Sequence, residues 1–273
     1  MNSLQHNLFI SLIVLSLTPI CHGVEIIGGH KVKPHSKPYM VSIQKYNRET
    51  KHYDHHCGGA LISPKWILTA AHCKKSGTFQ VVLGAHSLSQ NEKSQQKFQI
   101  KKMHSHPQFN KTTIENDIML LEISSEAKLN KYVKLLDLPK DDKDVKPGTP
   151  CTVAGWGATI PYSACSSDKL QEVKIRAIDR KKCKVKNDSE RVIVITEDMI
   201  CAGDSKGKKD ANKGDSGGPL ICNKKYKGIV SFGPRDPSTK EPGIYTRISK
   251  KYLDWIAKII GVYTSNMTAE GFY

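Results

Sequence analysis

The hexapeptide GDSGGP spans residues 214–219 and places Ser216 among three closely spaced glycines. A serine hydroxyl becomes an effective nucleophile only where a base accepts its proton and donors stabilise the oxyanion that forms. Glycines let the backbone turn tightly and bring peptide N–H groups close to a reacting carbonyl. A glycine-rich hexapeptide could also be a plain turn, so its meaning depends on what else the chain carries.

Two upstream segments supply the partners that such a serine needs. Residues 68–73 read LTAAHC and place His72 between an apolar run and a cysteine, and residues 116–120 read NDIML and place Asp117 before an apolar run. Taken singly, the histidine could be structural and the aspartate a strand cap. A buried carboxylate needs a partner, however, and an imidazole N–H is a suitable one. Together the order His, Asp, Ser indicates a triad for nucleophilic catalysis.

The three segments together, TAAHC, NDIML and GDSGGP, resemble the chymotrypsin–trypsin family of serine proteases over about residues 26–262. The resemblance implies that Ser216 attacks the substrate carbonyl, that His72 is its base and later the acid, and that Asp117 orients the imidazole. It also implies an oxyanion hole formed by the N–H groups of Gly214 and Ser216. No cofactor and no metal ion is expected.

The resemblance implies an all-β fold of two six-stranded antiparallel Greek-key β-barrels followed by an α-helix. Short apolar runs separated by turn-forming residues favour the same class. We expect the polar segment Leu138–Gly148 to connect the two barrels. The expected boundaries are a peptidase domain at 26–262, with an N-terminal barrel at about 26–140, a C-terminal barrel at about 141–249 and a helix at about 250–260, and then a tail at 263–273.

The first 23 residues are expected to be a secretory signal peptide. Leu8–Leu17 is apolar and uncharged but too short to span a bilayer comfortably, and no transmembrane segment is expected elsewhere. The sequence IIGG from Ile26 resembles the mature amino terminus of the family, whose freed ammonium inserts beside the residue equivalent to Asp215. Val24-Glu25 would then be a propeptide, which resembles the acidic dipeptide removed from granule-stored proteases.

Substrate preference is expected to depend on Asp210, six residues before Ser216. In the family this position is the floor of the S1 pocket, and a buried carboxylate there selects a Lys or Arg side chain because only a cation compensates its charge. Gly233 and Gly243 match the walls of that pocket and leave room for a long side chain. The expected substrates are therefore proteins cleaved after Lys or Arg.

Eight cysteines in a chain with a signal peptide predict disulfides. Cys21 leaves with the signal, and Cys165 is left over, either as a free thiol or as the link of a disulfide-bonded homodimer. Asn212 stands where the family often has a cysteine of a fourth pair, so we expect a looser rim of the S1 pocket. The family positions imply the pairs Cys57–Cys73, Cys151–Cys222 and Cys183–Cys201.

The chain is strongly basic, with a formal net charge of +16. Such a field attracts polyanions, although a solvated basic surface is an equally good explanation. The strings PHSKPYM at 34–40 and LGAHS at 83–87, together with the short acidic propeptide, resemble granzymes A and K, the tryptases of cytotoxic lymphocyte granules. That resemblance implies secretion, storage in cytoplasmic granules on acidic proteoglycan, and control by protease inhibitors such as serpins.

Other surface features carry weaker signals. Asn110, Asn187 and Asn266 begin N-x-S/T sequons and are candidate glycosylation sites. The histidines of KHYDHHC, at residues 51–57, could suggest a metal site, but we expect an exposed polar loop before a strand.

Two other functions stay open on the sequence. A digestive or plasma trypsin-like protease would be favoured by a longer propeptide ending in Lys or Arg. A catalytically inactive, polyanion-binding relative would be favoured by loss of His72 or Ser216, and both are present.

Overall fold

The structure is a computed structural model, and it describes residues 29–158, 166–185, 192–204, 211, 214–233 and 241–261. Within these residues it is built almost entirely of strands, followed by one helix. The elements are β1 (His30–Lys31), β2 (Met40–Asn47), β3 (His52–Ser63), β4 (Trp66–Thr69), a 3-10 turn (Ala71–Cys73), β5 (Phe79–Leu83), β6 (Gln96–Ser105), β7 (Met119–Ile123), β8 (Pro150–Gly155), β9 (Gln171–Ile178), a 3-10 turn (Arg180–Lys182), β10 (Met199–Gly203), β11 (Pro219–Cys222), β12 (Lys225–Phe232), β13 (Gly243–Arg247) and α1 (Lys250–Ile260).

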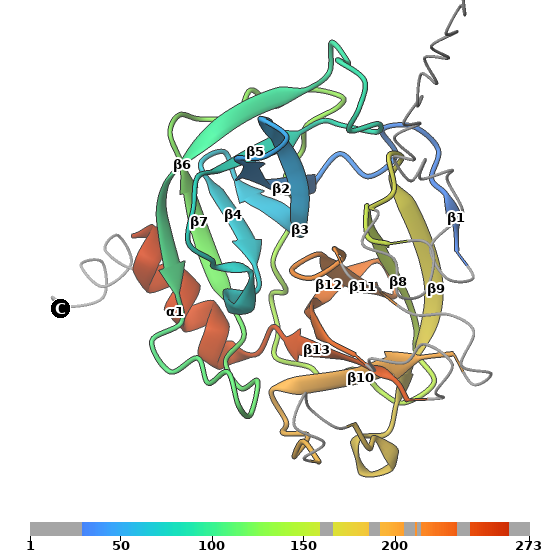
Figure 1. Cartoon of the computed structure of the whole chain (residues 1–273). Coiled ribbons are helices and arrows are strands. Elements are labelled where there is room, and N and C mark those ends of the chain that lie inside the picture. Colours follow the sequence, from blue (N-terminus) through green and yellow to red (C-terminus); the bar gives the residue numbers. More distant parts are fainter. Residues whose placement is uncertain are drawn as a thin grey trace, which may run out of the picture.

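The first barrel closes in the order β2-β3-β4-β7-β6-β5, and every pairing is antiparallel (Figure 1). Its strands present alternate side chains inward, as in the buried residues Val41 and Ile43 of β2. Leu61, Ile67 and Leu121 from three other strands complete the same apolar core.

The second barrel closes in the order β8-β9-β10-β13-β12-β11, because β8 pairs with both β11 and β9. The short strand β1 adds to the outside of β9. The prediction of two six-stranded antiparallel barrels is therefore confirmed. The core of this barrel is apolar and includes Val153, Val173, Ala202, Leu220 and Tyr245.

A third apolar cluster joins the two barrels. Met40 and Val82 come from the first barrel, and Ala154 and Leu170 come from the second. Trp156 is fully buried between them, and its indole N–H donates to the His86 carbonyl at 3.1 Å. This packing fixes the barrels relative to each other, which matters because the candidate active site is assembled from both.

Helix α1 leaves the second barrel and packs on the first (Figure 1). Tyr252 and Ile256 are four residues apart, so they lie on one face of the helix, and both are buried in the core cluster of the first barrel. The helix ends at Ile260, and the next residue, Gly261, has a φ of 80°, the left-handed conformation typical of the residue that ends a helix. In the part of the chain that the structure describes, no helix is long and apolar enough to cross a membrane.

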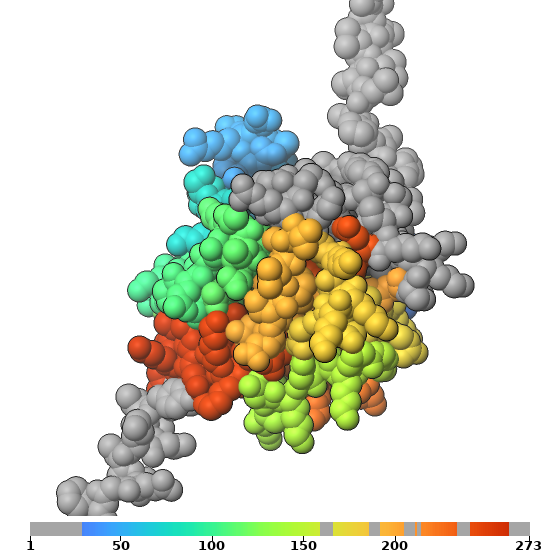
Figure 2. All heavy atoms as spheres, turned by 90° about the horizontal axis from the view of Figure 1, so that it is seen from below, coloured from blue at the N-terminus to red at the C-terminus, as the bar shows by residue number. Residues whose placement is uncertain are grey.

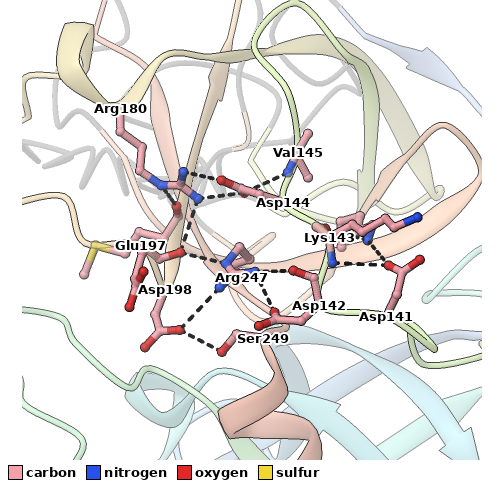
Figure 3. Close-up of polar contacts among 12 residues, drawn as sticks. Asp141, Asp142, Lys143, Asp144, Val145, Arg180, Glu197, Asp198, Arg247 and Ser249 are labelled. Carbon is pink, nitrogen blue, oxygen red and sulfur yellow. Dashed lines mark hydrogen bonds and ion pairs between the residues drawn. The ribbon is translucent and has the colours of Figure 1, made fainter.

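The segment Leu138–Gly148 does connect the barrels, and an ionic network fastens it to the second one (Figure 3). Three aspartates of this segment each pair with a cation from a different element. The pairs are Asp141 with Lys227 of β12 at 3.3 Å, Asp142 with Arg247 of β13 at 2.7 Å, and Asp144 with Arg180 at 2.5 Å.

Candidate active site

Asp117 lies at the centre of the candidate site, fully buried two residues before the start of β7. Its carboxylate accepts hydrogen bonds from three donors: the backbone N–H of His72 at 2.9 Å, Nδ1 of His72 at 2.6 Å and the hydroxyl of Ser231 at 2.5 Å. The Thr246 hydroxyl donates to the Asp117 carbonyl at 2.9 Å. Several donors make it possible to bury a carboxylate in its charged form. Ser231 and Thr246 were not among the residues that sequence reasoning singled out.

His72 lies in the 3-10 turn after β4, with its side chain about 30% exposed. A carboxylate only accepts, so Nδ1 must carry the proton in the bond to Asp117. The neutral ring then has a lone pair on Nε2. This is the protonation state that a base for a serine hydroxyl requires.

Ser216 is brought to the seam between the barrels by close backbone contacts. Its carbonyl accepts from Gly58 N–H at 2.8 Å, and the same oxygen lies 3.7 Å from Sγ of Cys73, the residue after His72. Gly217 has φ of 81°, and a Cβ there would lie 2.1 Å from the Thr69 hydroxyl. Any larger residue would push Ser216 away from the first barrel. Among the hydrogen bonds of the described residues, none joins the Ser216 hydroxyl to His72, and such contacts often tighten only when substrate binds.

Asp215 is fully buried beside Ser216 and accepts from the Gly157 N–H at 2.9 Å. Its carboxylate fills space left by two glycines, since a Cβ on Gly155 or Gly157 would lie about 2.1 or 2.5 Å from its atoms. The chain therefore contains a niche shaped for a buried carboxylate next to the nucleophile. Ile26, the residue predicted to pair with it, lies outside the described residues.

His55 is a residue whose place sequence reasoning missed. The expectation of an exposed polar loop at residues 51–57 is wrong, because residues 52–57 form the first half of β3 and His55 is half-buried against Trp156. Its Nε2 lies 2.9 Å from the Gly214 carbonyl, and its Nδ1 lies 2.8 Å from the Ser42 hydroxyl. A carbonyl only accepts, so Nε2 donates and Ser42 donates to Nδ1. The ring thus holds the carbonyl of Gly214, a residue whose N–H group is predicted to line the oxyanion hole.

Burial lowers the pKa of His55 to about 4. In the unfolded chain an ordinary imidazole binds a proton below about pH 6.5, whereas the folded protein resists it down to about pH 4. The contribution of neutral His55 to the free energy of unfolding is therefore fully present above about pH 6.5 and is lost as the pH falls towards 4. Allowing for partial exposure of the residue, we expect the loss to be roughly 2 kcal/mol.

Urea unfolding of wild type and His55→Gln at pH 7.5 and pH 4 measures this effect. Glutamine keeps a donor for Gly214 and an acceptor for Ser42, so the variant should lose less stability on acidification. Other histidines with lowered pKa contribute equally to both proteins. An identical pH dependence would contradict the assignment.

The predicted S1 wall residues lie at neighbouring ends of two paired strands. Phe232, the last residue of β12, pairs with Ile244 of β13, so Gly233, which follows β12, and Gly243, which begins β13, lie at the same end of this strand pair. The same end of β12 carries Ser231, which contacts Asp117. Asp210, expected at the pocket floor, lies outside the described residues, as does Asn212.

The three predicted disulfides are present: Cys57–Cys73, Cys151–Cys222 and Cys183–Cys201. The first of them pins the turn that carries His72. The sulfurs of Cys57 and Cys73 lie close to the His72 ring, but their mutual bond prevents them from serving as metal-binding thiolates.

The remaining predicted residues are only partly covered by the structure. Asn110 is exposed in the turn after β6, where its side chain accepts from Thr112 N–H at 2.8 Å. Cys165, Asn187 and Asn266 lie outside the described residues.

Comparison with known proteins gives a consistent result. The family model described as Trypsin matches residues 26–256. The chain is 44% identical to granzyme A of Bos taurus, covering 91% of this chain and 93% of that protein. It is 44% identical to granzyme B of Rattus norvegicus over 92% of this chain and 97% of that protein, and 42% identical to mast cell protease 3 of Ovis aries over 96% and 99%.

Proposed function

The chain belongs to the trypsin family of serine endopeptidases and has granzymes among its relatives, and we propose that it is a tryptase of the granzyme A and K type, which cleaves proteins after Lys or Arg. The observation that carries the catalytic part is the buried Asp117 bonded to His72 next to the loop of Ser216. The relatives carry names of several granzyme and mast cell protease types, so the Lys/Arg preference rests on Asp210.

In the proposed reaction the Ser216 oxygen attacks the carbonyl carbon of the scissile peptide bond while Nε2 of His72 takes the hydroxyl proton. Asp117 stabilises the imidazolium, and the N–H groups of Gly214 and Ser216 donate to the oxyanion. His72 then gives its proton to the leaving amine nitrogen as the carbon–nitrogen bond breaks. Water repeats the sequence on the acyl-enzyme, which releases the acid and restores Ser216.

Asp210→Ser tests the proposed specificity. Removing the carboxylate leaves a Lys or Arg side chain buried without its counter-charge, so we expect kcat/KM for Lys and Arg substrates to fall roughly 10³-fold. Matched fluorogenic peptides that differ only at the residue before the scissile bond provide the measurement. Tryptic cleavage at an unchanged rate would exclude Asp210 as the pocket floor.

Activation is proposed to occur by removal of Val24-Glu25. The new ammonium of Ile26 would enter the niche of Asp215, whose buried carboxylate between Gly155 and Gly157 supports this role. The backbone that carries Gly214 would then be held in its oxyanion-binding conformation. We expect protein that begins at Val24 to be roughly 10³-fold less active than protein that begins at Ile26, about the contribution of an oxyanion hole. Equal activity of the two forms against one peptide would defeat this proposal.

Secretion, granule storage on acidic proteoglycan and control by serpins complete the proposal. The net charge of +16 supports binding to a polyanion. Retention on heparin–agarose with release by salt tests this part, and passage of the protein without retention at low salt would argue against it.

A further inference from the structure

We propose that helix α1 positions the catalytic aspartate: Lys251 and Tyr252 hold Asn116, and Asn116 sets the place of Asp117. This inference rests on the proposed function, since it takes Asp117 as a member of the triad. It assigns a catalytic support role to a helix that packs on the first barrel (Figure 1).

The key contacts converge on one side-chain oxygen. Oδ1 of Asn116 accepts from Nζ of Lys251 at 2.6 Å and from the Tyr252 hydroxyl at 3.1 Å. The amide nitrogen of the same side chain donates to the Gln108 carbonyl at 3.0 Å. Two of the three bonds of the side chain therefore lead to α1, and the third stays within the loop between β6 and β7 that carries Asn116.

Asn116 also has an unusual backbone conformation. Its φ is 58°, a left-handed value that asparagine tolerates better than most residues. Its carbonyl accepts from the Ile118 N–H at 2.8 Å, which closes a tight turn with Asp117 at the middle. A change in the conformation of Asn116 therefore moves the Asp117 carboxylate directly, and with it the bond to His72.

The donors on α1 are themselves held in place. Nζ of Lys251 also contacts Asp198 at 3.2 Å, and Asp198 accepts from the hydroxyl of Ser249, the residue before the helix, at 2.7 Å. Arg247 approaches the same carboxylate at 3.9 Å and links it to the barrel connection through Asp142 (Figure 3). On the face seen in Figure 2, α1 (red) lies against residues of the second barrel.

Packing alone does not fix Asn116. A cavity of about 190 Å³ lies beside it, lined in part by Asp198, Lys251 and Tyr252. Since open space borders the side chain, its position depends on the hydrogen bonds described above. By contrast, the Tyr252 ring is buried and packs edge-on against His106, with 5.6 Å between the ring centroids. This packing holds the Tyr252 hydroxyl in place.

The experiment uses the enzyme that begins at Ile26, with four substitutions. Asn116→Ala removes the side-chain oxygen that accepts from Lys251 and Tyr252, and alanine tolerates the left-handed backbone less well. We expect kcat to fall roughly 30-fold with KM within about 2-fold, since a misplaced triad member can cost about 100-fold. Asn116→Asp keeps the acceptor for Lys251 and Tyr252 and the tolerance for the left-handed backbone, and loses only the donor to the Gln108 carbonyl, so it should stay within about 3-fold of wild type. Lys251→Met should lower kcat about 5-fold and Tyr252→Phe about 3-fold.

Lys250→Met is the matched control, because Lys250 lies next to Lys251 but pairs with Asp254 on the exposed face of α1. It should leave kcat unchanged. The low-field ¹H NMR resonance of the His72 Nδ1 proton gives a second readout: it should shift or broaden in Asn116→Ala and persist in Asn116→Asp. Thermal unfolding identifies any variant that fails to fold.

The outcomes separate this inference from the proposed function. Wild-type kcat in Lys251→Met and Tyr252→Phe, or equal losses in Lys250→Met and Lys251→Met, would overturn the inference. An unchanged Nδ1 resonance in Asn116→Ala would also overturn it. An inactive wild-type enzyme, or one matched by its Ser216→Ala variant, would instead overturn the proposed function.

Discussion

Ser216→Ala is expected to lower kcat for hydrolysis after Lys or Arg by about 10⁶-fold, the scale seen when a triad nucleophile is removed. The alanine leaves no oxygen to form the acyl-enzyme, while the oxyanion donors and substrate pocket remain. Water attack assisted by these groups should leave a residual rate about 10³-fold above the uncatalysed reaction. The measurement is kcat for one ester or peptide substrate, together with the burst of released leaving group, which should disappear.

Ser125→Ala is a suitable control because Ser125 is exposed just after β7. It changes the same atoms and should leave kcat unaffected. Circular dichroism and thermal unfolding should be alike for all three proteins. Among the hydrogen bonds of the described residues, none involves the Ser216 hydroxyl, so its removal costs no hydrogen bond of the folded protein. Retention of more than about 1% of wild-type turnover in Ser216→Ala would show that another group is the nucleophile.

The sequence predicted the helix and most strands because these segments have strong local patterns. Lys250–Ile260 was expected at its observed bounds, since its apolar face repeats at helical spacing. Four strands were not predicted from apolar runs: β1, β4, β6 and β10. In β6 the apolar residues alternate with polar ones and no residue is fully buried, so hydrophobic runs do not reveal it.

The candidate site was predictable where a motif carries the chemistry and not where it depends on pairing over long distances. His72, Asp117 and Ser216 were recognised from short strings, and the structure places them at the seam of the barrels. Ser231 and His55 were missed because nothing near them in the sequence points to Asp117 or Gly214. Strand register alone brings Ser231 of β12 to a carboxylate that is 114 residues away in the chain.

Asp117→Asn is expected to lower kcat by about 10⁴-fold, through the protonation of His72 rather than through lost packing. Oδ1 of Asp117 faces the backbone N–H of His72, which is always a donor. The asparagine oxygen must therefore occupy that position, and its NH₂ group must face Nδ1 in place of Oδ2. An NH₂ group only donates, so Nδ1 becomes an acceptor and the proton moves to Nε2, where it blocks transfer from Ser216.

The reverse orientation of the side-chain amide that Asp117→Asn introduces is also unfavourable. It would place two donors, the NH₂ group and the backbone N–H of His72, against each other in a site that is fully buried. Ser231→Ala is the informative comparison, because it removes one donor to Asp117 but leaves the preferred protonation of His72 unchanged, and it should cost only about 10-fold. Equal losses of kcat for Asp117→Asn and Ser231→Ala, measured on the same peptide, would mean that Asp117 acts by holding the site together and not by selecting the protonated nitrogen of His72.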